Sequence, residues 1–94
     1  MGHIYLVVRE RGVENPKVAH ISAIACNGVP LDLMLEAEKV EKNRLVREFS
    51  SHRYSIMQYV GGRFQQDSPE AAYLRKGLRE VTVEQILKRK RKRG

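Results

Sequence analysis

The chain has 94 residues, of which 41% are hydrophobic and 31% are charged. A chain of this length and composition forms one folded domain; it has no room for a second hydrophobic core and is neither disordered nor membrane-embedded. Its net charge of +7 comes almost entirely from six consecutive cations at positions 88–93, because the other residues carry 12 Lys and Arg against 11 Asp and Glu. We therefore predict a compact domain over residues 1–87 and a basic C-terminal tail over residues 88–94.

The first half of the chain is expected to form alternating strands and helices. Residues 4–9 are rich in β-branched and aromatic side chains and predict a strand. An Asn-Pro pair typical of a helix start precedes residues 17–26 and an Asn-Gly pair follows them, so we expect a helix there, with a strand as the alternative. Apolar and polar residues alternate over residues 31–38, which favours a strand over the helix that the residue types allow. Residues 43–49 carry apolar side chains at helical spacing and predict a helix.

The second half begins with a predicted strand over residues 54–60, which a Gly-Gly pair ends. A Ser-Pro-Glu sequence at Ser68 predicts the start of a helix, which Gly77 weakens. Residues 82–85 read Thr-Val-Glu-Gln, a capping box that predicts a last helix. The expected fold class is therefore α/β or α+β: a single small domain of two or three strands and about four short helices, whose C-terminal helix ends in the basic tail.

The motifs of the common enzyme classes are absent from the sequence. It contains no Walker A or G-x-G-x-x-G phosphate loop, no G-x-S-x-G nucleophile elbow and no H-E-x-x-H zinc motif. Cys26 is the only cysteine and the three histidines are scattered, which excludes an internal disulfide and gives no metal-ligand spacing. No apolar run near the start is long enough for a signal peptide or a membrane span. We expect a cytoplasmic protein, or a nuclear one in a eukaryotic host, without a metal, a catalytic residue or a membrane partner.

One cluster of residues around the Gly-Gly pair indicates an anion site. His52, Arg53 and Arg63 flank the glycines, and both guanidinium groups and the backbone N–H groups beside glycine suit phosphate. The two arginines would converge on one anion if the segment between them folded back. The alternative is that they are solvated surface side chains.

These residues resemble the signature R-H-R-x-x-S-x-N-x-x-S-x-R of flavin-dependent thymidylate synthases. His52 and Arg53 are followed ten residues later by Arg63, and the expected order of elements over residues 15–64, about half of the chain, is similar. The resemblance implies that His52 and Arg53 contact FAD and nucleotide and that Arg63 contacts the substrate phosphate. Ile56 occupies the position of the catalytic serine, so the resemblance implies a flavin or nucleotide site without catalysis.

The basic tail carries the leading functional prediction. Adjacent cations repel one another, so a polyanion that neutralises them is favoured, and such binding depends on salt rather than on sequence. Arg75, Lys76 and Arg79 are expected on the polar side of the preceding helix, where they would extend this surface. The predicted nucleic-acid-binding residues are therefore Arg75, Lys76, Arg79, Lys88, Arg89, Lys90, Arg91, Lys92 and Arg93. We thus expect a small nucleic-acid-binding protein, and not an enzyme, with largely non-specific phosphate contacts.

Three alternatives to this prediction stay open. The tail could be a solubilising end or a nuclear localisation signal. The domain could be a shortened relative of the flavin-dependent thymidylate synthases that binds FAD or a nucleotide. It could also be a protein-interaction module of a virus or mobile element, which would bring a protein partner. Each of these is compatible with a homo-oligomer.

Overall fold

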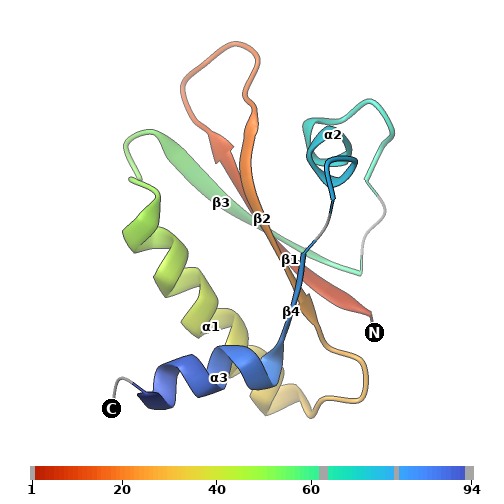
Figure 1. Ribbon diagram of the computed structural model, residues 1–94. Helices are drawn as coiled ribbons and strands as arrows, with labels where there is room; N and C mark the ends of the chain where they lie inside the picture. Colours follow the sequence, from red (N-terminus) through yellow and green to blue (C-terminus); the bar gives the residue numbers. More distant parts are fainter. Residues whose placement is uncertain (1, 62–63, 78, 93–94) are drawn as a thin grey trace.

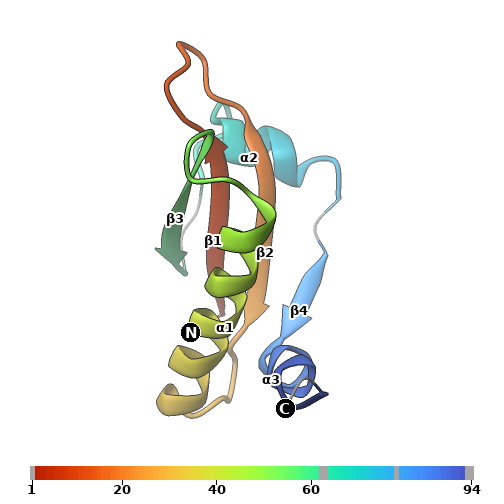
Figure 2. The same ribbon diagram turned by 90° about the vertical axis from the view of Figure 1, so that its left-hand side faces the viewer.

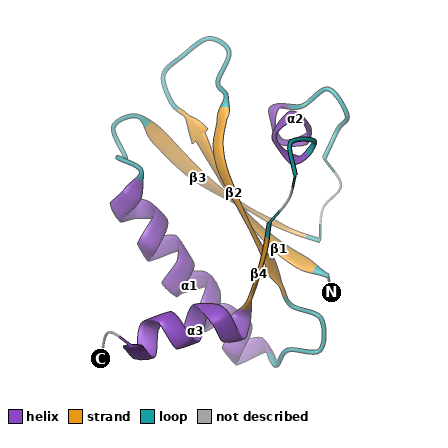
Figure 3. Cartoon of the chain, viewed as in Figure 1, coloured by secondary structure: helices purple, strands orange, loops and turns teal. Residues whose placement is uncertain are grey.

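The computed structural model describes residues 2–61, 64–77 and 79–92, which contain four strands and three helices (Figure 1). In chain order these are β1 (His3–Glu10), β2 (Val18–Ala25), α1 (Leu31–Glu48), β3 (Tyr54–Val60), α2 (Pro69–Leu74), β4 (Glu80–Thr82) and α3 (Val83–Lys92). The strands form one sheet in the order β3-β1-β2-β4 (Figure 3). The predicted single small α/β domain is therefore confirmed, with more strands and fewer helices than expected.

The sheet is mainly antiparallel. β1 pairs antiparallel with both β2 and β3, whereas the short strand β4 pairs parallel with β2. In the register Leu6 lies opposite Ser22 of β2 and Gln58 of β3. Because side chains alternate between the two faces of a strand, these three side chains point to the same face of the sheet.

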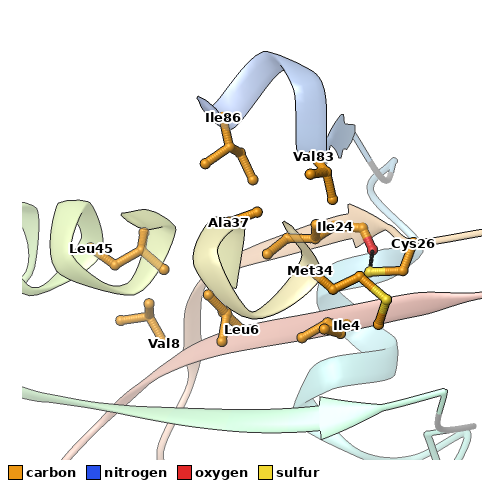
Figure 4. Close-up of a cluster of buried hydrophobic side chains, with 10 residues drawn as sticks. All are labelled: Ile4, Leu6, Val8, Ile24, Cys26, Met34, Ala37, Leu45, Val83 and Ile86. Atoms are coloured by element: carbon orange, nitrogen blue, oxygen red, sulfur yellow. Dashed lines mark hydrogen bonds between the residues drawn. The ribbon is translucent and has the colours of Figure 1, made fainter. Parts of the chain in front are cut away.

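Helices cover both faces of the sheet. Figures 1 and 2 show α1 on one side and α2 on the other, with α3 beside the first half of α1. Figure 4 shows Val83 and Ile86 of α3 above Ala37 of α1 and Ile24 of β2. The buried cluster that joins these elements consists of Ile4, Leu6, Val8, Ile24, Cys26, Met34, Ala37, Leu45, Val83 and Ile86. This packing fixes α3 against α1 and the sheet.

Local signals in the sequence located several elements correctly. The predicted strands over residues 4–9 and 54–60 are β1 and β3, and the helix over 43–49 is the end of α1. Ser68 Oγ accepts a hydrogen bond from Ala71 N over 3.1 Å at the start of α2. The predicted capping box is also formed, since Thr82 Oγ1 accepts from Gln85 N over 3.1 Å and Gln85 Oε1 accepts from Thr82 N over 3.0 Å. These predictions succeed because they depend on neighbouring residues only.

The helix expected over residues 17–26 is wrong, because this segment forms β2. It lies inside the sheet, with Ile24 facing α1 and both Ile21 and Ala23 facing the opposite side, and all three are buried. A strand that is buried on both faces does not show the alternation of apolar and polar residues that marks a half-exposed strand. The Asn-Gly pair ends the strand instead of a helix, and Gly28 has a φ of 76°, which glycine adopts without strain.

The strand expected over residues 31–38 is also wrong, because these residues form the first half of α1. The buried residues of the helix are Met34, Ala37, Glu41 and Leu45, which follow the spacing of three and four residues of a single helix face. The apparent alternation came from leucines that face solvent, with Leu31 64% exposed. Exposed apolar residues therefore masked the helical period.

Candidate functional site

A cavity of about 880 Å³ opens at the edge of the sheet beside α1 and α3. The short strand β4 pairs only with residues 23–25 of β2, so in the described structure the earlier residues of β2 have no strand beside them on this edge. The cavity lies there. Its lining residues are mostly polar or charged: His20, Ile21, Ser22, Glu41, Arg44, Tyr73, Gly77, Arg79, Glu80, Val81, Gln85, Lys88 and Arg89.

Buried polar groups joined by hydrogen bonds form the floor of the cavity. The register of β2 places His20 and Ser22 on the face covered by α1, where Glu41 is buried. Ser22 Oγ donates a hydrogen bond to Glu41 Oε2 over 2.7 Å, and His20 Nε2 lies 2.9 Å from Ser22 Oγ. A hydroxyl group has one proton, and Ser22 gives it to the carboxylate, so we assign the Nε2–H tautomer to His20, which then donates to Ser22.

The pKa of His20 indicates a neutral imidazole, which has one N–H group and one acceptor nitrogen. Burial and the positive charge of Arg44 lower the pKa of His20 below its ordinary value of 6.5, and the nearby carboxylates of Glu41 and Glu48 offset this only in part. The imidazole is therefore neutral at pH 7. Its second nitrogen is left as a hydrogen-bond acceptor.

Arg44 holds the carboxylate of Glu41 in place. Its Nε donates to Glu41 Oε1 over 2.8 Å and its Nη2 donates to Glu41 Oε2 over 2.9 Å, while Nη1 donates to Glu48 Oε2 over 2.8 Å. Burial alone would raise the pKa of Glu41, but the hydrogen bonds from Arg44 and Ser22, with the charges of Arg44 and Arg89, outweigh it and lower the pKa. Glu41 is thus an ionised group whose two oxygens are occupied, and it is not a free base.

The rim of the cavity carries cations with few partners inside the chain. Lys88 Nζ lies 3.3 Å from Glu84 Oε1, and Arg89 Nη1 lies 3.9 Å from Glu41 Oε1. Arg79 has no ion-pair partner among the described residues. The lining as a whole contains four cations against two carboxylates and is therefore electropositive.

The structure separates the cations that the sequence placed on one helix. α2 ends at Leu74, with Arg75 as its C-cap, and Gly77 with a φ of 116° follows before Arg79. Arg75 donates to the carbonyl oxygen of Gln66 and does not line the cavity, and Lys76 is exposed in the turn. The expectation that Arg75, Lys76 and Arg79 share one helix face is therefore wrong, because the helix is shorter than predicted.

The cations at the end of the chain begin inside α3. Lys88 and Arg89 line the cavity together with Arg79, whereas Lys90, Arg91 and Lys92 continue the helix. Arg93 lies outside the described residues. Five of the six consecutive cations are therefore helical, and the first two face the cavity.

The second predicted cluster is not assembled in the described part of the chain. His52 and Arg53 are exposed in the turn before β3, where Arg53 O accepts a hydrogen bond from Arg11 N over 2.8 Å. Arg63 lies outside the described residues, and Gly61, close to it in sequence, follows the other end of β3. The seven residues of β3 span roughly 20 Å as an extended strand, so this segment does not fold back.

Sequence reasoning missed the groups that α1 and β2 contribute to the cavity. His20 and Ser22 stand two residues apart, as side chains on one face of a strand do, and Glu41, Arg44 and Glu48 have the spacing of ion pairs along a helix. The pairing of His20 with Ser22 was hidden because residues 17–26 were expected to form a helix. Glu41 lies before the helix expected over residues 43–49, so its place on one helix with Arg44 and Glu48 was not predicted. Nothing in the sequence pointed to Tyr73 at this cavity, and Gln85 was expected only as part of the capping box.

No helix in the described ranges combines the length and the hydropathy needed to traverse a bilayer. The same residues contain no group of three or more His, Cys, Asp or Glu side chains placed to hold a metal ion. Comparisons with protein-family models, with curated proteins and with solved structures find no match to this chain.

Proposed function

We propose that this protein binds nucleic acid through the cations of α3 and of the cavity rim, with little dependence on base sequence. The observation that carries this proposal is the convergence of Arg44, Arg79, Lys88 and Arg89 on one cavity, from α1, from the residues before β4 and from α3. Guanidinium and ammonium groups are the side chains that neutralise phosphate. The cations that continue α3 beyond Arg89 extend the same charge along the helix.

The carboxylates of the lining offset only part of this positive charge, because four cations stand against two carboxylates. Glu41 is occupied by Arg44 and Ser22, and Glu80 Oε1 lies 2.8 Å from His3 Nε2. An incoming phosphate therefore meets carboxylates that already have hydrogen-bond partners, while Arg79 and Arg89 keep N–H donors that are free within the described residues. This favours an anionic ligand over a cationic one.

The ion pair between Lys88 and Glu84 leaves Lys88 able to contact phosphate. Both side chains are largely solvent-exposed, at 66% and 77%, and they are four residues apart on one helix. Pairs of this kind contribute only about 0.3–0.5 kcal/mol, which is less than one charge-assisted contact with phosphate provides, at roughly 1.5–3 kcal/mol.

The test compares two double variants of the full chain that each remove two positive charges. Lys88→Gln with Arg89→Gln removes cations of the proposed surface, and Lys42→Gln with Arg47→Gln removes exposed cations of α1 that lie outside the cavity lining. Binding to a fluorescent single-stranded oligonucleotide is measured by anisotropy at several salt concentrations.

The first variant is expected to bind more weakly and to reduce the slope of log K against log salt by about 1.4, since each phosphate contact on a single strand contributes about 0.7. The α1 variant is expected to keep the slope of the unmodified protein. Equal slopes in the two variants, or no salt-dependent binding by the unmodified protein, would contradict the proposed function.

A further inference from the structure

The cavity differs in shape from the surface of α3. It is recessed, because the almost fully buried Ser22 and Glu41 belong to its lining, whereas the cations of a helix project from a convex surface. A strand that runs along α3 would touch it with internal phosphodiester groups. A recess can instead be entered by the end of a strand or by a free nucleotide. The cavity and the helix surface therefore suit different parts of a nucleic acid.

Two guanidinium groups at the cavity have donors that are not used within the described chain. Arg89 Nη1 lies 3.9 Å from Glu41 Oε1, which is beyond hydrogen-bond distance, and neither Arg79 nor Arg89 donates to any described residue. Arg44, by contrast, uses three of its N–H donors in hydrogen bonds to Glu41 and Glu48. An anion in the cavity would thus be held mainly by Arg79 and Arg89, while Arg44 neutralises the carboxylate behind them.

The charge of the site fits a phosphomonoester better than an internal phosphate. A phosphomonoester carries about −1.5 to −2 charges at pH 7 and three free oxygens, whereas a phosphodiester within a strand carries a single charge and is linked on both sides. Donors that approach from different elements can reach the three oxygens of a terminal group together. At an internal phosphate, the same donors would meet the nucleic-acid strand that continues on either side.

The remaining lining offers contacts for the rest of a nucleotide. Tyr73 is half-buried at the cavity, and its ring stacks with no other ring in the described residues. Gln85 uses its Oε1 atom to cap α3, which leaves its amide N–H₂ group free to donate. An aromatic face and an amide donor beside a phosphate site suit a base or a sugar.

We propose that the cavity binds the terminal phosphomonoester of a nucleotide, held by Arg79 and Arg89. This nucleotide is either the end of a nucleic-acid strand or a free mononucleotide. The first alternative rests on the proposed function. In the first case the protein binds strands preferentially at a phosphorylated end, and α3 contacts the phosphates that follow. Base identity is not read by the phosphate site itself.

The experiment uses one oligonucleotide sequence with an internal dye, prepared with a 5′-phosphate, with a 3′-phosphate and with both ends as hydroxyl groups. Affinities for the full chain are compared at one salt concentration with those of Arg79→Ala and of Arg47→Ala. Arg79 and Arg47 are both exposed, but Arg47 lies on α1 outside the lining. Circular dichroism confirms that each variant is folded. AMP is titrated separately into each protein by calorimetry.

One phosphorylated oligonucleotide is expected to bind about tenfold more tightly than the hydroxyl form, the effect of one added charge-assisted contact. Arg79→Ala should abolish this ratio and Arg47→Ala should preserve it. Equal affinities of all three oligonucleotides together with no Arg79-dependent binding of AMP, or a ratio that survives in Arg79→Ala, would overturn the inference and leave the proposed function standing. If no oligonucleotide binds, the proposed function fails, and Arg79-dependent binding of AMP would still support the cavity as a phosphomonoester site. If AMP also does not bind, both proposals are overturned.

Discussion

The buried carboxylate of Glu41 gives the sharpest test of how the cavity is held together. Its side chain is only 3% exposed, and it accepts two hydrogen bonds from Arg44 and one from Ser22. Glu41→Gln keeps the size of the side chain but replaces one acceptor oxygen by an N–H₂ group and removes the charge. One donor of Arg44 or Ser22 would then face another donor, and the guanidinium would lose its buried counter-charge.

The cost can be bounded from the geometry. Breaking a fully buried ion pair costs about 3–5 kcal/mol, but the side chain of Arg44 is 40% exposed, so water compensates part of the loss. We therefore expect Glu41→Gln to lower the free energy of unfolding by about 2–3 kcal/mol, close to one or two hydrogen bonds to a charged group. For a domain of this size the melting temperature would fall by roughly 10–20 °C.

Urea unfolding followed by far-UV circular dichroism measures this change. The matched control is Glu84→Gln, which removes the exposed partner of Lys88 and should alter the free energy of unfolding by less than about 0.5 kcal/mol. A double-mutant cycle of Glu41→Gln with Arg44→Gln should give a coupling of about 1–2 kcal/mol. If Glu41→Gln is as stable as Glu84→Gln, or the coupling is absent, the floor of the cavity is not organised by this pair.

Two further predictions concern pH and helix capping. The pKa of His20 is lower in the folded state, so the folded state binds this proton less well than the unfolded state does. The stability of the protein should therefore fall as the pH drops below about 6.5. The lowered pKa of Glu41 adds a further loss of stability below about 4.5. Melting temperatures between pH 7.5 and 5.5 should show this fall, and it should be smaller in His20→Gln; an equal fall in both proteins would contradict the assignment. Thr82→Ala removes the cap of α3 and should cost about 1 kcal/mol in unfolding free energy, whereas Thr82→Ser, which keeps the hydroxyl group, should cost clearly less.

The sequence by itself determined the elements whose signals are local. The Ser-Pro start of α2 and the capping box of α3 involve residues within four positions of one another, and both occur in the structure as predicted. The concentration of cations at the end of the chain, and the near-neutral balance of the rest, are also properties of the sequence alone. The class of a small α/β domain follows from these helix starts together with the strands predicted over residues 4–9 and 54–60.

Two elements were decided by the tertiary structure. β2 lies between α1 and α2 and is buried on both faces, so its sequence lacks the alternation that would have identified it. The first half of α1 carries exposed leucines, which imitate a strand when the neighbouring elements are unknown. In both cases the burial of the segment depends on which elements pack against it, and the residues of the segment alone do not indicate this.

The candidate site can also be separated into what the sequence predicted and what only the tertiary structure decided. Lys88 and Arg89 could be predicted from the run of cations, but their place at a cavity with Arg44, Arg79 and His20 depends on contacts between residues distant in the chain. The sheet register sets His20 beside Ser22, and the packing of α3 on α1 brings Arg89 within 3.9 Å of Glu41. Charge is a property of each residue, whereas the gathering of charges at one cavity requires the fold, because only long-range packing fixes which side chains lie together.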